Sequence, residues 1–417
     1  MPSTLPEGDP VAVDGSLPDQ AYEGIAERGL GFYIHVPFCA TRCGYCDFNT
    51  YTAGELGMPT TGAHRTNSAI DSWLAGALAE IDLAAKVLHT GSSVRRRVST
   101  VFVGGGTPSL IGAGPLTAVL QRIEQRFGLA DNAEVSTEAN PESTDPALLA
   151  GLREAGYTRL SLGMQSVSPK VLAVLERNHT PGKALEVAAQ ARAAGFEHLN
   201  LDLIYGTPGE TDAEFAESLQ AVIEAQVDHV SAYSLIVEPG TKLARQVKAG
   251  LLPMPDDDVL ADRYLLADRA LSEAGMRWYE VSNWATNDDA QCRHNLSYWS
   301  SGDWWGIGPG AHSHVGGVRW WNVKHPAKYA SAMAEGVSPG YAREVLDGKA
   351  RRVERILLGL RLAAGLPSDL FTEAGTVEAG HAVREGLLEP ADWERGRAVL
   401  TLQGRLLADG LAIRLLD

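Results

Sequence analysis

The sequence predicts an α/β fold, a partial (β/α)6 barrel followed by a small, mainly helical C-terminal domain of winged-helix type. From Gly31 onward, short apolar runs alternate with longer helical patterns, which indicates βαβ crossovers and a parallel sheet. Six such units also suit a doubly wound sheet. The barrel is favoured because polar or glycine residues follow the ends of successive strands, the ends that converge on the mouth of a barrel.

Apolar patterning places each strand and helix of the barrel. The helix expected at 212–226 is the clearest, because its apolar residues recur at helical spacing and Thr211 with Glu214 matches a capping box. Strands are expected at 32–36, 100–104, 134–138, 159–163, 198–203 and 229–235. Helices are expected at about 71–88, 114–127, 146–155, 168–194, with a break near Pro181, and 212–226.

Composition divides the chain into four segments. The first is rich in carboxylates and prolines and is expected to be a flexible acidic tail, whereas the third is dense in Trp, His and Gly. The last shows helical patterning at 354–362 and a turn-and-strand pattern at 409–415. The segments are the tail (1–28), the barrel (29–245), a connecting segment (246–345) with a strand-like stretch at 277–283, and the C-terminal domain (346–417).

The charge balance excludes one class of partner. Lys and Arg number 36 against 52 Asp and Glu, a net charge of −16, which argues against a protein that grips nucleic acid phosphates. No secretory signal and no uncharged apolar run of membrane-spanning length is found, so we expect a cytoplasmic protein without an intrinsic membrane segment. Four cysteines, three of them bunched, do not suit a disulfide framework and are expected to be ligands or catalysts.

The bunched cysteines, Cys39, Cys43 and Cys46, follow the first strand in C-x3-C-x2-C spacing. Zinc prefers four ligands in a closed tetrahedron, and a second cysteine pair is missing, although His35 or Cys292 would complete a structural zinc site. Three thiolates instead suit a [4Fe-4S] cluster in which one iron stays open for an exogenous ligand. We therefore expect an iron–sulfur cluster on this loop.

With Tyr45 just before its third cysteine, this loop resembles the signature of the radical S-adenosylmethionine (SAM) superfamily. The resemblance implies the partial barrel, the [4Fe-4S] cluster on the three cysteines, and SAM bound to the open iron. In that family the cluster supplies one electron that cleaves SAM to methionine and a 5′-deoxyadenosyl radical, while the protein positions the reacting groups and excludes water.

Residues that follow the later strands complete the expected SAM site. The glycines after the second strand allow close approach of the backbone, and by resemblance they hold the methionine end of SAM. Carboxylate and amide side chains after the next two strands suit the ribose hydroxyls or the ammonium group, and Arg177 suits the SAM carboxylate. The expected SAM residues are Tyr33, Gly105, Gly106, Thr107, Glu138, Gln165, Arg177 and Asp202.

Together these positions resemble the coproporphyrinogen III dehydrogenase-like branch of the superfamily, which holds both a radical enzyme and a group of HemW-type heme chaperones. The enzyme pattern has another cysteine two positions after the third, whereas here Asp47 and Phe48 follow Cys46, as in the chaperone group. A second likeness is the H-N-x-x-Y-W motif of that group, formed here by His294, Asn295, Tyr298 and Trp299.

This motif is the expected heme site. A neutral imidazole is a good axial ligand for heme iron, and aromatic rings offer faces to a porphyrin. We expect heme contact from His294, Asn295, Tyr298 and Trp299, with His312, His314 and Cys292 as competitors for the iron. The alternative is that the His294 ring bonds a neighbouring carbonyl and the aromatics pack the junction with the C-terminal domain.

The resemblance thus implies a heme chaperone that uses a [4Fe-4S] cluster and SAM and passes heme to an acceptor heme protein. Flavodoxin or ferredoxin is an expected reductant. The alternatives are an oxygen-independent coproporphyrinogen III oxidase, which would make the protein an enzyme, and a related radical SAM methyltransferase.

Overall fold

The parallel sheet predicted from the sequence is present in the computed structural model, which describes residues 7–56, 63–178 and 180–416. Its first six strands are all parallel and adjacent in chain order. They are β1 (Leu30–Val36), β2 (Val98–Gly105), β3 (Leu129–Ala139), β4 (Arg159–Gln165), β5 (His198–Tyr205) and β6 (His229–Ser234). The six strands expected from apolar patterning are therefore confirmed.

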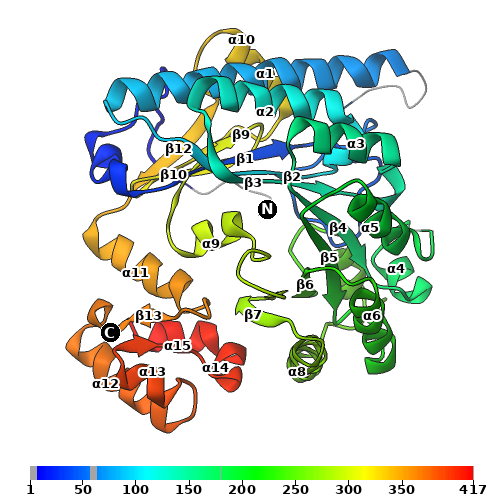
Figure 1. The fold of residues 1–417 in the computed structure, drawn as a ribbon, viewed down its shortest axis with the longest axis vertical. Helices are drawn as coiled ribbons and strands as arrows, with labels where there is room; N and C mark the ends of the chain where they lie inside the picture. Colours follow the sequence, from blue (N-terminus) through cyan, green and yellow to red (C-terminus); the bar gives the residue numbers. More distant parts are fainter. Residues whose placement is uncertain (1–6, 57–62, 179, 417) are drawn as a thin grey trace.

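Helices that follow these strands cover the outer face of the sheet (Figure 1). They are α1 (Ala63–Gly91), α2 (Ala113–Phe127), α3 (Pro146–Ala155), α4 (Pro169–Val174), α5 (Lys183–Ala193) and α6 (Asp212–Glu224). The break near Pro181 separates α4 from α5 as expected, and the capping box of Thr211 and Glu214 is formed at the start of α6. Helix α1 is longer than expected at both ends, since polar residues flank its apolar stripe.

The segment expected as a connection extends the sheet at both edges. Strand β9 lies parallel to β1, and β10, β11 and β12 follow it in antiparallel order, while β8 and β7 extend the opposite edge beyond β6. These strands are β7 (Arg277–Glu280), β8 (Asn283–Ala285), β9 (Asp303–Ile307), β10 (His312–Val315), β11 (Val318–Asn322) and β12 (Gly340–Val345). The helices between and before them are α7 (Lys242–Lys248), α8 (Asp257–Glu273), α9 (Arg293–Trp299) and α10 (Pro326–Ala334).

Residues 7–28 of the first segment pack against this extended edge, whereas composition suggested a flexible tail. Residues 1–6 lie outside the described residues. Asp9 pairs with Arg343 of β12 through both backbone groups, and Ala21 and Ile25 are buried. The buried Asp303 of β9 accepts from Arg28 at 3.0 Å. Backbone pairing and burial, which composition does not register, hold this stretch in place.

The C-terminal domain has a hydrophobic core of its own. It consists of α11 (Gly348–Gly359), β13 (Leu366–Pro367), α12 (Glu373–Arg384), α13 (Pro390–Glu394), β14 (Arg397–Ala398), α14 (Leu402–Leu406) and α15 (Ala408–Arg414). The turn-and-strand expected at 409–415 is wrong, because α15 occupies that stretch. Leu411, Ala412 and Leu415 all reach the core from one face of this helix.

None of the helices in the described part of the chain is both long and apolar enough to cross a membrane. Figure 1 shows α9 on the inner side of the curved sheet, opposite α1 and α2, with the C-terminal domain, which begins with α11, farther from the sheet. The inner side of the sheet is therefore the region where the expected SAM and heme residues have to meet.

Candidate functional site

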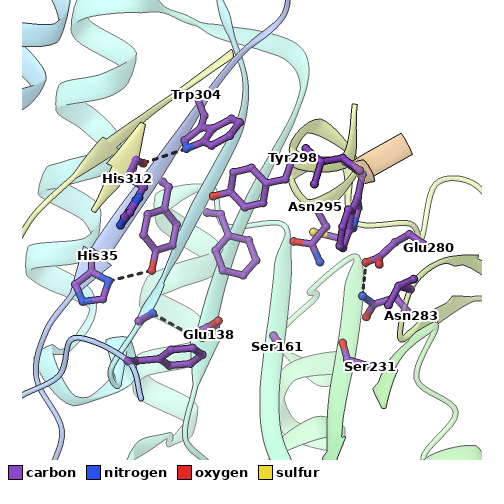
Figure 2. A pocket seen from close by; sticks show the side chains of 18 of the residues that line it. His35, Glu138, Ser161, Ser231, Glu280, Asn283, Asn295, Tyr298, Trp304 and His312 are labelled. Atoms are coloured by element: carbon purple, nitrogen blue, oxygen red, sulfur yellow. Dashed lines mark hydrogen bonds between the residues drawn. The ribbon is translucent and has the colours of Figure 1, made fainter. Parts of the chain in front are cut away.

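A cavity of about 1020 Å³ occupies this inner side. Its wall combines inward-facing residues along β1 to β6 with α9 and the strands at both edges of the sheet, so it draws on residues from Tyr33 to Leu358 (Figure 2). Of the residues expected to bind SAM or heme, the wall includes Tyr33, Gly105, Glu138, Asp202, Asn295, Tyr298 and Trp299. The structure thus brings the two expected sites into one space.

The cysteine loop, residues 37–51, closes one end of this space. Backbone bonds between Cys39 and Tyr51 and between Tyr51 and Pro37 tie its two ends together. Within it, the Cys46 amide donates to the Cys43 carbonyl at 3.2 Å, and Gly44 bonds the turn after α4. Burial raises the pKa of Cys39 and raises that of Cys46 to about 11, an effect that bound iron opposes because iron is held by the thiolate.

The glycines after β2 lie directly against this loop. A Cβ on Gly106 would be 2.6 Å from the Phe38 carbonyl oxygen and 3.1 Å from the Cys39 sulfur, so only glycine permits this approach. The amides of Gly106 and Thr107 donate to the carbonyls of Val36 and Phe38, which means they extend the β1–β2 pairing and do not point into the cavity. The Thr107 hydroxyl donates to the Cys39 sulfur at 3.6 Å.

Two carboxylates face the cavity beyond the glycines. Glu138 accepts from the Gly105 amide at 3.1 Å, and burial together with repulsion from Asp202 raises its pKa to about 7. Asp202 accepts from Ser161 and Asn200, at 3.1 and 2.6 Å, and burial raises its pKa as well. Both side chains thus retain cavity-facing acceptor capacity suited to hydroxyl and ammonium donors.

Arg177 reaches the cysteine loop from beyond the end of α4. Its guanidinium donates to the Cys43 sulfur at 3.3 Å and to the Gly163 carbonyl at 3.2 Å, and its buried Nε has no partner among the described residues. Gln165 ends β4 at a φ of 67°, in the left-handed region that a glutamine rarely adopts, and it is buried outside the cavity wall. Of these two expected SAM residues, only Arg177 contacts the cluster region.

These residues fit the groups that the sequence suggests. Three thiols on one loop supply the soft ligands of an iron–sulfur cluster, and Arg177 supplies a cation with a free donor beside them. Cys39, Cys43 and Cys46 would hold the cluster, and SAM would lie toward Glu138 and Asp202. When bound, the cluster and SAM supply one-electron chemistry.

The zinc alternative does not fit the same geometry. Both ring nitrogens of His35 are bonded, one to the Tyr33 hydroxyl at 3.0 Å and the other to the Asn49 carbonyl at 2.9 Å. The Cys292 thiol points to Glu134 at 3.6 Å, at the other end of the cavity wall. Neither residue is thus available as the fourth ligand.

Tyr33 and Tyr298 give this wall its aromatic character. Tyr33 of β1 stacks on Phe102 with ring centroids 6.4 Å apart, and Phe102 in turn stacks on the His294 ring. Tyr298 meets Trp304 edge to face at 4.5 Å. Aromatic surfaces therefore line the space between the expected SAM and heme residues (Figure 2).

His294 differs from the other residues of its motif. It is fully buried, with Nδ1 bonded to the Thr100 hydroxyl at 2.9 Å and Nε2 bonded to the Tyr298 hydroxyl at 2.8 Å. Its ring thus fixes α9 against β2 and orients Tyr298, and it does not reach the cavity wall. Tertiary packing thus occupies both nitrogens of His294, so the expected heme contact by this residue would require it to give up one of these bonds.

A buried ion pair positions the start of α9, and the sequence analysis did not identify it. The Glu134 carboxylate of β3 accepts from the amides of Arg293 and His294, both at 3.0 Å, and pairs with Arg159 of β4 at 3.2 Å. Arg159 donates in addition to the carbonyls of Ala290 and Gln291. The only signal in the sequence was a pair of charges within apolar strands, which is costly unless they are satisfied.

Glu280, at the end of β7, faces the opposite side of the cavity, beside Asn283 (Figure 2). Burial raises the pKa of this carboxyl to about 8, and no cation is paired with it within the described residues. Asn283, Trp299 and Asn295 donate toward it. Glu280 therefore connects the β7–β8 edge to two residues of the α9 motif.

Comparison with known proteins agrees with this geometry. The model of the Radical SAM superfamily matches residues 33–222. The heme chaperone HemW of Mycobacterium tuberculosis is 53% identical over 93% of this chain and 95% of its own length, and HemW of Bacillus subtilis is 32% identical over 82% and 86%. Among solved structures, coproporphyrinogen III oxidase (HemN) of Escherichia coli superposes with a TM-score of 0.78 at 23% identity, over 95% of this chain and 92% of the other, which shows the shared fold.

Proposed function

Because the chain belongs to the radical SAM superfamily, and within it to the HemW heme chaperone family, we propose that it binds heme in the inner cavity and passes it to acceptor heme proteins. The observation that carries this proposal is the cavity itself, with its volume of about 1020 Å³ and an aromatic wall that includes the α9 motif. Flat aromatic faces and a large apolar space suit a porphyrin.

The cysteine loop and the residues around it support a [4Fe-4S] cluster and SAM at one end of the same cavity. Cys39, Cys43 and Cys46 would hold the cluster, and Glu138, Asp202 and Tyr33 would line the SAM site beside it. Gln165, Gly106 and Thr107 would act from behind this wall, where they shape the loop and the end of β4.

The heme would lie toward α9. Asn295, Tyr298 and Trp299 face the cavity there, and the buried His294 keeps them in position through its bonds to Thr100 and Tyr298. The motif would therefore bind heme through Asn295, Tyr298 and Trp299, and its histidine would position these three residues.

The partners follow from this function. An acceptor heme protein takes the heme, and a flavodoxin or ferredoxin would reduce the cluster. We place the protein in the cytoplasm, since thiolate cluster ligands require a reducing compartment. The proposal treats the chain as a chaperone, and enzymatic turnover of a porphyrinogen is the alternative that the experiment has to exclude.

The experiment uses the full chain, reconstituted with iron and sulfide under anaerobic conditions. Heme is titrated in while the Soret band is recorded, and the loaded protein is then mixed with an apo-cytochrome to measure transfer. A parallel sample receives coproporphyrinogen III, SAM and a reductant. We expect saturable heme binding, transfer to the acceptor, and no loss of coproporphyrinogen III. Absence of a stable Soret band, or turnover of the porphyrinogen, would overturn the proposal.

A further inference from the structure

We infer that His312 of β10, which lies outside the H-N-x-x-Y-W motif, is the axial ligand that the protein offers to heme iron. This inference rests on the proposed heme-binding function and specifies which atom of the cavity wall meets the iron. It follows from a comparison of the hydrogen bonds, burial and protonation of the described histidines and cysteines that line the cavity or belong to the motif or lie near it.

Of the histidines that the structure describes, three line the cavity, and two of them have no nitrogen to offer. His35 uses both nitrogens on Tyr33 and Asn49. His229 uses both as well, on the Asn200 side chain and the Tyr279 hydroxyl, each at 2.7 Å. An imidazole so bonded coordinates iron only if it gives up a buried hydrogen bond.

His312 is the third histidine of the wall, and its ring is open. Across residues 7–56, 63–178 and 180–416 no hydrogen bond is made to either of its ring nitrogens, and the side chain is only partly buried. Its backbone carbonyl accepts from the Trp304 indole at 3.0 Å, which anchors the residue without using the imidazole (Figure 2). The ring stacks on Trp321 with centroids 5.8 Å apart.

The remaining candidates for the iron are less suitable. His314 donates from Nδ1 to the Gly302 carbonyl, 2.7 Å away, and does not line the cavity. Cys292 lines the cavity, but burial raises the pKa of its thiol strongly, so the thiolate that heme iron requires is disfavoured. The same holds for the phenols of Tyr33 and Tyr298, whose pKa values burial also raises.

The surroundings of His312 keep its imidazole in the ligand form. Burial, with repulsion from Lys324 and Arg319, lowers its pKa to about 4, so the ring is neutral at physiological pH. Glycine at position 306 permits this packing, because a Cβ there would lie 2.2 Å from the His312 carbonyl oxygen. Arg319 of the adjacent strand β11, opposite His314, lines the same wall and pairs with Glu344 at 2.7 Å and Glu354 at 2.5 Å.

The test compares His312→Ala with His294→Ala in the full chain, with His325→Ala as the matched control. His325 caps α10 through its ring and does not line the cavity. Each variant is titrated with ferric heme, and the absorption and electron paramagnetic resonance spectra are recorded with and without added imidazole. Circular dichroism establishes that each variant is folded.

We expect His312→Ala to lose the imidazole-ligated spectrum, to bind heme more than about tenfold more weakly, and to regain the wild-type spectrum with added imidazole. His294→Ala should keep that spectrum, with weaker binding from the loosened α9, and His325→Ala should match the wild type. The inference is overturned if His312→Ala keeps the imidazole-ligated spectrum, or if only His294→Ala is rescued by imidazole. A wild-type chain that binds no heme would instead refute the proposed function, and the ligand assignment with it.

Discussion

Replacing Glu134 by glutamine tests whether the buried ion pair positions the start of α9. The substitution keeps the shape of the side chain but removes the charge that faces Arg159, and both side chains are almost wholly buried, with 3% and 2% exposed. Removal of one partner of a buried pair costs about 3–5 kcal/mol. The glutamine carbonyl still accepts from one of the two backbone amides, so we expect about 3 kcal/mol, at the lower end of that range.

The assay has to be local, because the C-terminal domain has its own core and global unfolding need not be one transition. We expect the amides of Arg293 and His294 to exchange hydrogen about a hundredfold faster in Glu134→Gln, since 1.4 kcal/mol corresponds to about tenfold. Heme binding should weaken too, because α9 presents three residues to the cavity.

The matched control is Glu197→Gln, which removes a carboxylate from the exposed pair with Arg153, where the N–O distance is 3.4 Å. An exposed pair contributes about 0–1 kcal/mol, so exchange at Arg293 and His294 should be unchanged in this variant. Equal exchange rates in Glu134→Gln and the wild type would refute the role that we assign to the ion pair.

Three further predictions follow from the site. Serine in place of Cys39, Cys43 or Cys46 should each abolish the cluster absorption and lower bound iron, whereas Cys292→Ser should retain both; a cluster that survives in the first three would refute the ligand set. Gly106→Ala should lower the cluster content and reduce the free energy of unfolding by about 1–3 kcal/mol, because the new Cβ contacts the Phe38 carbonyl and the Cys39 sulfur. In the control, Gly114→Ala, the new Cβ meets nothing within 4 Å, so thermal unfolding should show a neutral or stabilising effect. Because the pKa of Glu280 rises from 4.5 to about 8 on folding, the folded state binds the proton more tightly, and the stability that the protonated carboxyl contributes is lost as pH rises through about 8. Between pH 4.5 and 8, the urea midpoint of Glu280→Gln should therefore decline less steeply than that of the wild type. Parallel profiles would contradict the assignment.

The fold could be predicted far into the chain because its signals are local. Apolar runs and capping residues placed β1 to β6 and the helices after them, and the capping box at Thr211 was formed as predicted. The edge strands β9 to β12 were not predicted, since each is short and set among Trp, His and Gly residues. Their pairing is decided by contacts far apart in the chain, such as that of Tyr33 with Gly306.

The C-terminal end of the chain shows the limit of periodicity in a short segment. Residues 409–415 fit a turn and strand as a local pattern, yet Leu411, Ala412 and Leu415 pack together only when the segment is helical. The core that selects the helix comes from α11 and α12, which the local sequence does not contain.

By itself, the sequence determined which residues were available for each kind of chemistry. Three cysteines in one loop indicate a cluster wherever the loop lies, and glycines and carboxylates after successive strands indicate one mouth, because these patterns are local and the carboxyl ends of parallel strands converge. Only the tertiary structure decided which of the histidines stay open. Thr100 of β2 and Tyr298 of α9 take the nitrogens of His294, and Asn200 of β5 and Tyr279 of β7 take those of His229, whereas the His312 ring stays open on the cavity wall. Three of these four bonds join residues 29 to 194 positions apart, so they depend on packing and leave no local pattern in the sequence.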